Sequence, residues 1–115
     1  MKVQLKFITN SIEALKEIAA LNLKAKHSFQ VARLIKSAQG ELESYDTARI
    51  ATIKKFSSDG QKVDDDKVPV FISEINELLE KEVELSDCVI TEADLQDFSL
   101  KAATILQLEW LIKKE

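Results

Sequence analysis

The spacing of hydrophobic and polar residues changes several times along this 115-residue chain. In "MKVQLKFIT" the two classes alternate, which is typical of a β-strand with one solvated face. Asn10 and Glu13 then fit the N-cap and capping-box positions of a helix. The inner face of this helix is expected to comprise Ile12, Leu15, Ile18 and Ala19. Asn22 predicts the break before the next helix, because Asn tolerates the left-handed conformation that often ends helices.

Residues 26–56 contain no proline and one glycine, Gly40, and they predict a single long helix. Its apolar stripe follows alternating steps of four and three residues, the spacing of a helix that packs along another helix. The stripe consists of Val31, Ile35, Ala38, Leu42, Tyr45, Ala48, Thr52 and Phe56. Gly40 is expected either to weaken the helix by about 1 kcal/mol relative to Ala or to admit a neighbouring backbone.

The predicted length of this helix has a consequence for function. A helix of about 31 residues is about 46 Å long, whereas a compact chain of this size is roughly 35 Å across. The following helix is too short to cover the whole apolar stripe. The long helix is therefore expected to be the spine of the fold, a surface offered to a partner, or both.

The polar segment "SSDGQKVDDDK" predicts a turn that is tightest at Asp59-Gly60. Pro69 fits the first turn of a third helix, whose inner face is expected to comprise Phe71, Ile75, Leu78 and Leu79. The alternation in "VELSDCVI" predicts a second strand that pairs with the first, with a bulge or break near Ser86-Asp87.

The C-terminal quarter of the sequence carries two further helix signals. Thr91 and Asp94 have the spacing of a capping box. Ser99 is expected to cap the last helix, whose inner positions are predicted as Ala102, Ile105, Leu106, Glu109 and Ile112. The complete pattern predicts a mostly helical α+β fold of order β-α-α-α-β-α, in one domain over residues 1–115. We expect the long central helix to form an antiparallel helical hairpin, beside a small two-stranded sheet.

Composition and charge narrow the class of protein. The chain is 45% hydrophobic and 31% charged, as in folded globular proteins. No secretory pattern is visible and no apolar run is long enough for a bilayer, so we expect a soluble, cytoplasmic protein without membrane contact. Residues 1–36 carry seven Lys/Arg against two Glu, and residues 61–97 carry three Lys against twelve Asp/Glu. This asymmetry favours pairing between the two halves, or leaves a basic face free for an anion.

Candidate chemical groups are sparse. His27 is the single histidine and has no carboxylate one helical turn away, which favours a surface or capping role. Cys88 lies in a strand pattern, where a buried, inert thiol is expected. The acidic segment around Asp64 does not meet the EF-hand spacing, and two glycines cannot form a phosphate-binding loop. We therefore predict no enzyme activity, no metal and no cofactor, and the acidic chain with few aromatic residues argues against a nucleic-acid partner.

One long stretch resembles a known group of proteins. "LNLKAKHSFQVARLIKSAQGELESYDTARIATIKKF" is similar to small tailed-bacteriophage proteins of unknown function. The similarity is carried by Lys-x-Ser at residues 26–28, Ala-Arg-x-Ile at 32–35, Glu-Leu-x-x-Tyr at 41–45 and the Lys-Lys-Phe end at 54–56. The "DG" turn, "INELLEKEVEL" and "LEWLI" extend it to about residues 21–115. This resemblance implies a viral origin and assigns no catalytic residue.

Two functional hypotheses follow. The first is a non-enzymatic phage protein that acts through helix-mediated protein contacts, as a structural or assembly component of the virion tail or neck, with a protein partner or self-association. Its contact residues are predicted to be Phe29, Arg33, Lys36, Ile53 and Phe56. The alternative is a small phage protein in the host cytoplasm that inhibits a host enzyme or defence factor through acidic residues 61–97. Nucleic-acid binding through the basic N-terminal half is a third hypothesis.

Overall fold

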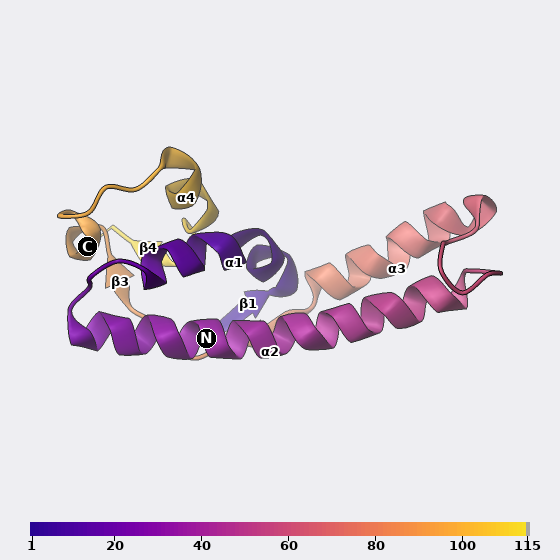
Figure 1. The fold of residues 1–115 in the computed structure, drawn as a ribbon, viewed down its shortest axis with the longest axis horizontal. Helices are drawn as coiled ribbons and strands as arrows, with labels where there is room; N and C mark the ends of the chain where they lie inside the picture. The colour runs from indigo at the N-terminus through magenta and orange to yellow at the C-terminus, as the bar shows by residue number, and fades with distance from the viewer. Residues whose placement is uncertain (115) are drawn as a thin grey trace.

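The protein is elongated, with extents of 53 × 24 × 21 Å in a computed structural model that describes residues 1–114. Glu115, the end of the predicted domain, lies outside the described residues. Figure 1 shows a body at one end, from which two long helical segments project side by side. The element order is β1 (Lys2–Gln4), α1 (Leu5–Ala19), α2 (Ala25–Lys55), η1 (Asp65–Lys67), α3 (Val68–Glu80), β2 (Glu82–Glu84), β3 (Ile90–Thr91), η2 (Ala93–Leu95), α4 (Ala102–Gln107) and β4 (Ile112–Lys113).

The mostly helical α+β class and the long central helix are confirmed. α2 runs unbroken over 31 residues. The predicted line of residues from Val31 to Phe56 is buried or half-buried throughout, because helical spacing keeps it on one side. α3 begins with Pro69 in its first turn and returns along α2. Gly40 does not mark a close approach, since a Cβ atom there would meet no heavy atom within 4 Å.

The single small sheet of the prediction is replaced by two. β1 pairs with β2 in antiparallel fashion, with Val3 opposite Val83. β3 pairs with β4 in parallel, with Ile90 opposite Ile112. The break predicted near Ser86-Asp87 is present, since residues 85–89 separate β2 from β3. This irregular segment turns the chain from the first sheet to the second.

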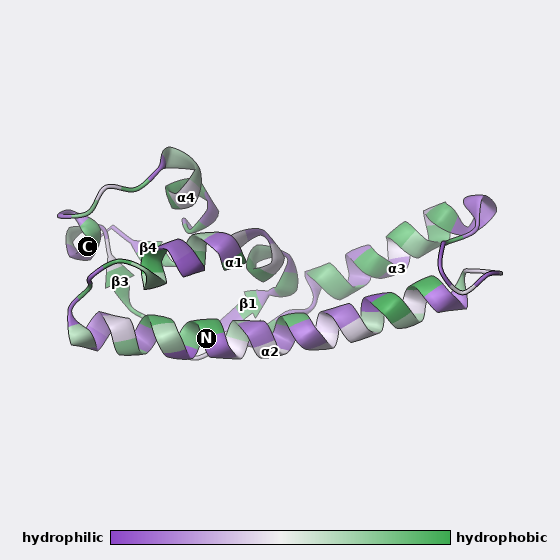
Figure 2. Cartoon of the chain, viewed as in Figure 1, coloured by the Kyte–Doolittle hydropathy of each residue, from purple (hydrophilic) through white to green (hydrophobic). Residues whose placement is uncertain are grey.

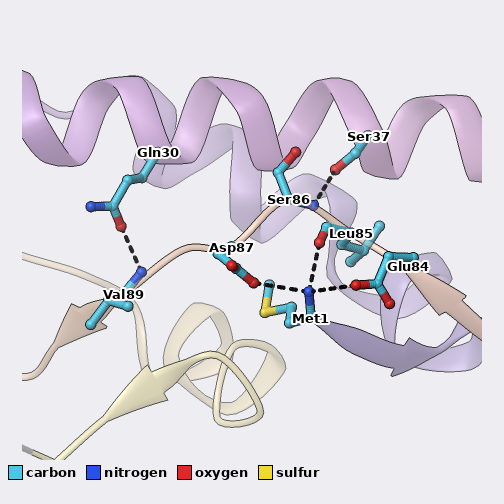
Figure 3. Close-up of polar contacts among 8 residues, drawn as sticks. All are labelled: Met1, Gln30, Ser37, Glu84, Leu85, Ser86, Asp87 and Val89. Atoms are coloured by element: carbon cyan, nitrogen blue, oxygen red, sulfur yellow. Dashed lines mark hydrogen bonds and ion pairs between the residues drawn. The ribbon is translucent and has the colours of Figure 1, made fainter.

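Segment 85–89 is held by hydrogen bonds from two directions (Figure 3). The Ser86 N–H donates to Ser37 Oγ at 3.2 Å, and the Val89 N–H donates to Gln30 Oε1 at 2.6 Å, so α2 holds one side. The Met1 amino group donates to Asp87, Glu84 and the Leu85 carbonyl on the other side. The Asp87 carboxylate, followed by that of Glu84, raises the pKa of this amino group.

The N-terminal prediction was wrong in its boundaries. The strand ends at Gln4 and α1 begins at Leu5, so Asn10 lies inside the helix and does not cap it. Leu5, Ile8 and Ala14 are buried. Ala19, which was predicted for the inner face of this helix, is exposed. Alternation over a few residues also fits helical spacing, and packing of Leu5 and Ile8 into the core favours the helix. The break after α1 occurs as predicted, but without a left-handed residue at Asn22.

The C-terminal helix is much shorter than predicted. α4 spans six residues, and Lys101, rather than Ser99, occupies its N-cap position. Thr104, Leu108 and Leu111 are buried, whereas the predicted inner residues Ile105 and Leu106 are exposed. After Gln107 the chain leaves the helix, so that Leu108 and Leu111 enter the core and Ile112 pairs with β3.

The hydrophobic core lies in the body. Its buried members are Leu5, Ile8, Ala14, Leu15, Ile18, Val31, Leu34, Ala38, Leu85, Cys88, Ile90, Leu95, Leu108 and Leu111. They come from α1, the first half of α2 and the segment after α3. No residue between positions 41 and 80 is fully buried. The body therefore supplies most of the hydrophobic stabilisation, and it holds α2 by its first half.

Candidate functional site

The pair of helices that projects from the body is the most distinctive feature of this molecule. We call it the arm and define it as residues 41–80, which comprise the second half of α2, the connecting segment and α3. Its inner seam is formed by half-buried residues of both helices: Leu42, Tyr45, Ala48, Thr52, Phe71, Ile75 and Leu78. Leu79 is half-buried as well, so all four residues predicted for the inner face of the third helix are at least partly covered. Two helices alone cannot enclose a core, so this seam stays partly open to solvent.

The tip of the arm is ordered by short-range hydrogen bonds. The Asp59 carboxylate accepts the N–H groups of Gln61 at 2.8 Å and Lys62 at 3.0 Å, and the hydroxyl of Ser57. These donors stabilise the charged form and lower the pKa of Asp59 to about 2. Gly60 follows with φ of 78°, a left-handed conformation that favours glycine. The predicted tight turn at Asp59-Gly60 is confirmed, and it gives the arm a defined end.

The two flanks of the arm differ in character. On one flank, Lys55 Nζ lies 2.8 Å from Glu74 Oε1, which is the ion pair that joins the arm helices within residues 1–114. A shallow groove lined by Ala48, Thr52, Glu74, Glu77 and Leu78 lies beside it. These contacts fix which sides of α2 and α3 form the polar flank, because each residue advances about 100° around a helix.

The opposite flank is apolar toward the tip of the arm, and the exposed Asp46–Arg49 ion pair lies on the same side of α2 nearer the body. Counting about 100° per residue from Lys55 and Glu74 places Ile50, Ile53, Val68 and Ile72 together on it. Ile50 is 47% exposed, Val68 37% and Ile72 50%, whereas Ile53 is half-buried. We call these four residues the apolar flank. Figure 2 shows that hydrophobic positions recur along both arm helices. Large apolar side chains left in water at one place are characteristic of a contact surface.

The predicted contact residues fall into two groups at opposite ends of α2. Phe29, Arg33 and Lys36 are exposed on the part of α2 that lies in the body, and Phe29 is 65% exposed. Ile53 and Phe56 are half-buried in the arm. Phe29 and Ile53 are separated by about 36 Å along the helix at 1.5 Å per residue. The five residues therefore do not form one surface.

The sequence pattern contained a signal for the two members of the apolar flank that lie on α3. Val68 and Ile72 are apolar, but they were not assigned to the inner face of α3, and the structure exposes both. An apolar stripe wider than the face that one neighbouring helix covers is the sign of a second contact. Their position relative to Ile50 and Ile53 could be found only after the two helices were paired.

The expected pairing between the basic and acidic halves involves no Lys or Arg side chain in the described residues. The ion pairs that join residues 1–36 to residues 61–97 use the Met1 amino group and His27. Arg33 and Lys36 are exposed and form no ion pair within residues 1–114. The basic residues beside Phe29 thus remain available as a second, cationic surface on the body.

His27 has a carboxylate partner that is distant in sequence. Its Nε2 lies 3.3 Å from Asp94 Oδ1, and its side chain is only 12% exposed. The predicted surface role is therefore wrong: His27 links the start of α2 to the turn at η2. The Asp94 carboxylate also accepts the Thr91 N–H in the predicted capping box, which is confirmed. This bond, followed by the charges of His27 and Lys24, lowers the pKa of Asp94.

The groups that could carry chemistry are dispersed. Cys88 is buried as predicted, and burial raises the pKa of its thiol to about 11, so it is protonated and a poor nucleophile near neutral pH. Within residues 1–114 no three potential ligand side chains lie together as a metal site requires. A pocket of about 770 Å³ beside α4 is lined by apolar Phe98 and Ile105 and by charged Glu109 and Lys114. None of these arrangements pairs a nucleophile with a base.

Comparisons with known proteins found no matching family model, curated protein or solved structure. No helix within residues 1–114 is both long and apolar enough to span a membrane.

Proposed function

We propose that this is a non-enzymatic protein that acts through protein–protein contacts of its arm. The observation that carries the proposal is the position of the apolar flank. Ile50, Val68 and Ile72 are exposed on a segment that extends from the body and in which no residue is fully buried. Covering such side chains contributes roughly 25 cal/mol per Å² of apolar surface removed from water, which favours association with a partner.

The arm is also built to present this surface at a distance. Its first helix continues without interruption from the body, where Leu34 and Ala38 are completely buried. Its tip is ordered by the Asp59 hydrogen bonds. A preorganised surface loses less conformational entropy on binding than a mobile one, so binding energy is retained. These properties suit a component that connects other proteins in an assembly.

The resemblance to small tailed-phage proteins supports a virion setting. We propose a structural or assembly component of the tail or neck, made in the host cytoplasm and incorporated into the particle. The cationic surface around Phe29, Arg33 and Lys36, about 36 Å from Ile53 along α2, gives such a component a second point of contact.

Incorporation into particles tests this proposal. Mass spectrometry of purified virions is expected to detect the wild-type chain. Ile72→Asp places a charge on the apolar flank and is expected to reduce incorporation at least tenfold, an effect of about 1.4 kcal/mol. Leu106→Asp is the matched control, because Leu106 is 65% exposed on the body, and it should incorporate normally. Absence of the wild-type chain from virions would overturn the structural role.

The alternative function, inhibition of a host protein, is favoured by one observation. Asp65, Asp66, Glu77 and Glu80 are exposed and form no ion pair within the described residues. Such carboxylates suit a basic site on a partner. Affinity capture from host lysate over a series of salt concentrations tests this alternative. A host protein retained at low salt and released at high salt would support it, and recovery of nothing above background would exclude it.

A further inference from the structure

We propose that the pocket beside α4 binds a small molecule that combines an apolar body with one positively charged amine. The pocket has a volume of about 770 Å³, which lies within the range of ligand sites in proteins, roughly 300 to 1,000 Å³. All of its lining residues belong to segment 92–114, which runs from the residue after β3, through α4, to the residue after β4 (Figure 1). The site therefore lies on the body, and the proposal is independent of the arm.

The buried part of the pocket lining is apolar and continuous with the hydrophobic core. Leu95 is a member of this core and is 7% exposed. Phe98, Leu100 and Ile112 are partly buried and pack against the core. Ile105 also lines the pocket, and it is 45% exposed. Removal of these side chains from water favours a ligand with an apolar body.

The exposed part of the lining carries more negative than positive charge. Glu92, Glu109 and Lys114 are all exposed, and two carboxylates and one ammonium group leave a net charge of −1 at the mouth of the pocket. Within residues 1–114 no ion pair involves Glu92 or Glu109. The chain as a whole carries −4. A cationic group at the mouth is therefore attracted, and an anionic group is repelled.

Backbone hydrogen bonds hold both carboxylates at the pocket. The Glu92 N–H donates to the Lys113 carbonyl oxygen at 2.8 Å, directly beside the pairing of β3 with β4. The Leu111 N–H donates to the Leu108 carbonyl oxygen at 2.9 Å, which closes the turn that carries Glu109. Because the backbone on both sides of the pocket is ordered by these bonds, ligand binding has a smaller entropic cost than it would have in a mobile segment.

Titration of the purified full-length chain with two probes of the same apolar body tests the proposal. Naphthylmethylamine is the cationic probe, and naphthylacetate is its anionic counterpart. Amide NMR spectra near neutral pH report which residues respond to each probe. We expect the amine to shift the amide signals of the pocket segment with a dissociation constant of roughly 0.1–1 mM, as for a ligand of this size. Naphthylacetate should bind about tenfold more weakly, because the mouth is negative.

Substitutions at exposed lining positions test the two parts of the ligand separately. Ile105→Gln removes apolar lining and should weaken the binding of both probes about fivefold. Leu106→Gln is its matched control, because the neighbouring Leu106 is 65% exposed and does not line the pocket. The double variant Glu92→Gln/Glu109→Gln should remove the preference for the amine, whereas Glu77→Gln on the arm should retain it. The same spectra show whether each variant is folded.

The possible outcomes either support the site or overturn it. Absence of amide shifts in the pocket segment at millimolar amine, or equal weakening by Ile105→Gln and Leu106→Gln, overturns the binding site. Equal or tighter binding of naphthylacetate, or an unchanged preference for the amine in the double variant, overturns the proposed charge of the ligand. Amine binding in the pocket combined with absence of the chain from virions would retain the site and overturn the virion role.

Discussion

Replacement of Ser11 by alanine is a sensitive test of how the C-terminal segment is attached to the body. Ser11 lies in α1 and is 1% exposed. Its hydroxyl oxygen accepts the Trp110 Nε1–H at 2.9 Å. The same hydroxyl lies 3.0 Å from the Gln107 carbonyl oxygen and close to that of Phe7, and it donates its proton in this direction. One buried hydroxyl thus joins α1 to both sides of the turn that follows α4.

The magnitude of the effect can be worked out from these contacts. Ser11→Ala removes the acceptor of Trp110 and the donor to Gln107, at about 1 kcal/mol for each hydrogen bond. Alanine has a higher helix propensity than serine, which returns about 0.5 kcal/mol. The net loss of unfolding free energy is therefore about 1.5 kcal/mol. For a chain of this length, this corresponds to a decrease in Tm of roughly 6 °C.

Ser44→Ala provides the matched control for this measurement. Ser44 is exposed on α2, and its hydroxyl donates only to the Gly40 carbonyl one turn earlier, at 3.3 Å. The same gain in helix propensity applies, so the unfolding free energy should stay the same or rise by about 0.5 kcal/mol. Urea unfolding followed by the fluorescence of Trp110, the single tryptophan, measures both variants. If Ser11→Ala is as stable as Ser44→Ala, the assignment of Ser11 as the buried link is refuted.

Two other predictions concern the helix interior and the tip of the arm. Gly40→Ala should raise the unfolding free energy by about 1 kcal/mol, because the added Cβ would meet no atom. Gly60→Ala should lower it by about 1 kcal/mol, because Gly60 has a φ of 78°. Thermal melts in which the Gly60→Ala variant is the more stable of the two would contradict both assignments. Because the pKa of Asp59 in the folded protein, about 2, lies below its usual 3.8, its contribution to stability is present above pH 3.8 and is lost as the pH falls through about 2. NMR titration of the Asp59 carboxyl group should give a midpoint near pH 2. Asp59→Asn should abolish this contribution to the acid dependence of stability. A midpoint near 3.8 would refute the proposed hydrogen bonds to the carboxylate.

The parts of the fold that could be predicted from the sequence are those fixed by local physics. α2 follows from a long run without helix breakers and with regular apolar spacing. Pro69, the Asp59-Gly60 turn and the Thr91–Asp94 capping box each have a mechanism that acts within a few residues. The half-buried inner face of α3 follows from its period. These features depend little on the rest of the chain, and the structure contains them all.

The features that could not be predicted depend on contacts between distant segments. Leu5 begins a helix rather than continuing a strand because it packs into a core contributed by other elements. α4 stops at Gln107 because Leu108 and Ile112 have partners elsewhere in the body. The carboxylate beside His27 comes from a distant turn. None of these outcomes has a signal within a window of a few residues, so a period-based prediction selects the longer regular element.

The relation between body and arm explains how one helix can be both spine and contact surface. In its first half, α2 buries Val31, Leu34 and Ala38 beneath α1. In its second half it has only α3 beside it, and none of its side chains is fully buried. The free energy that keeps the arm folded is therefore smaller than that of the body, and it would increase when a partner covers Ile50 and Ile72. Binding on the apolar flank and the stability of the arm are thus coupled, because the same side chains determine both.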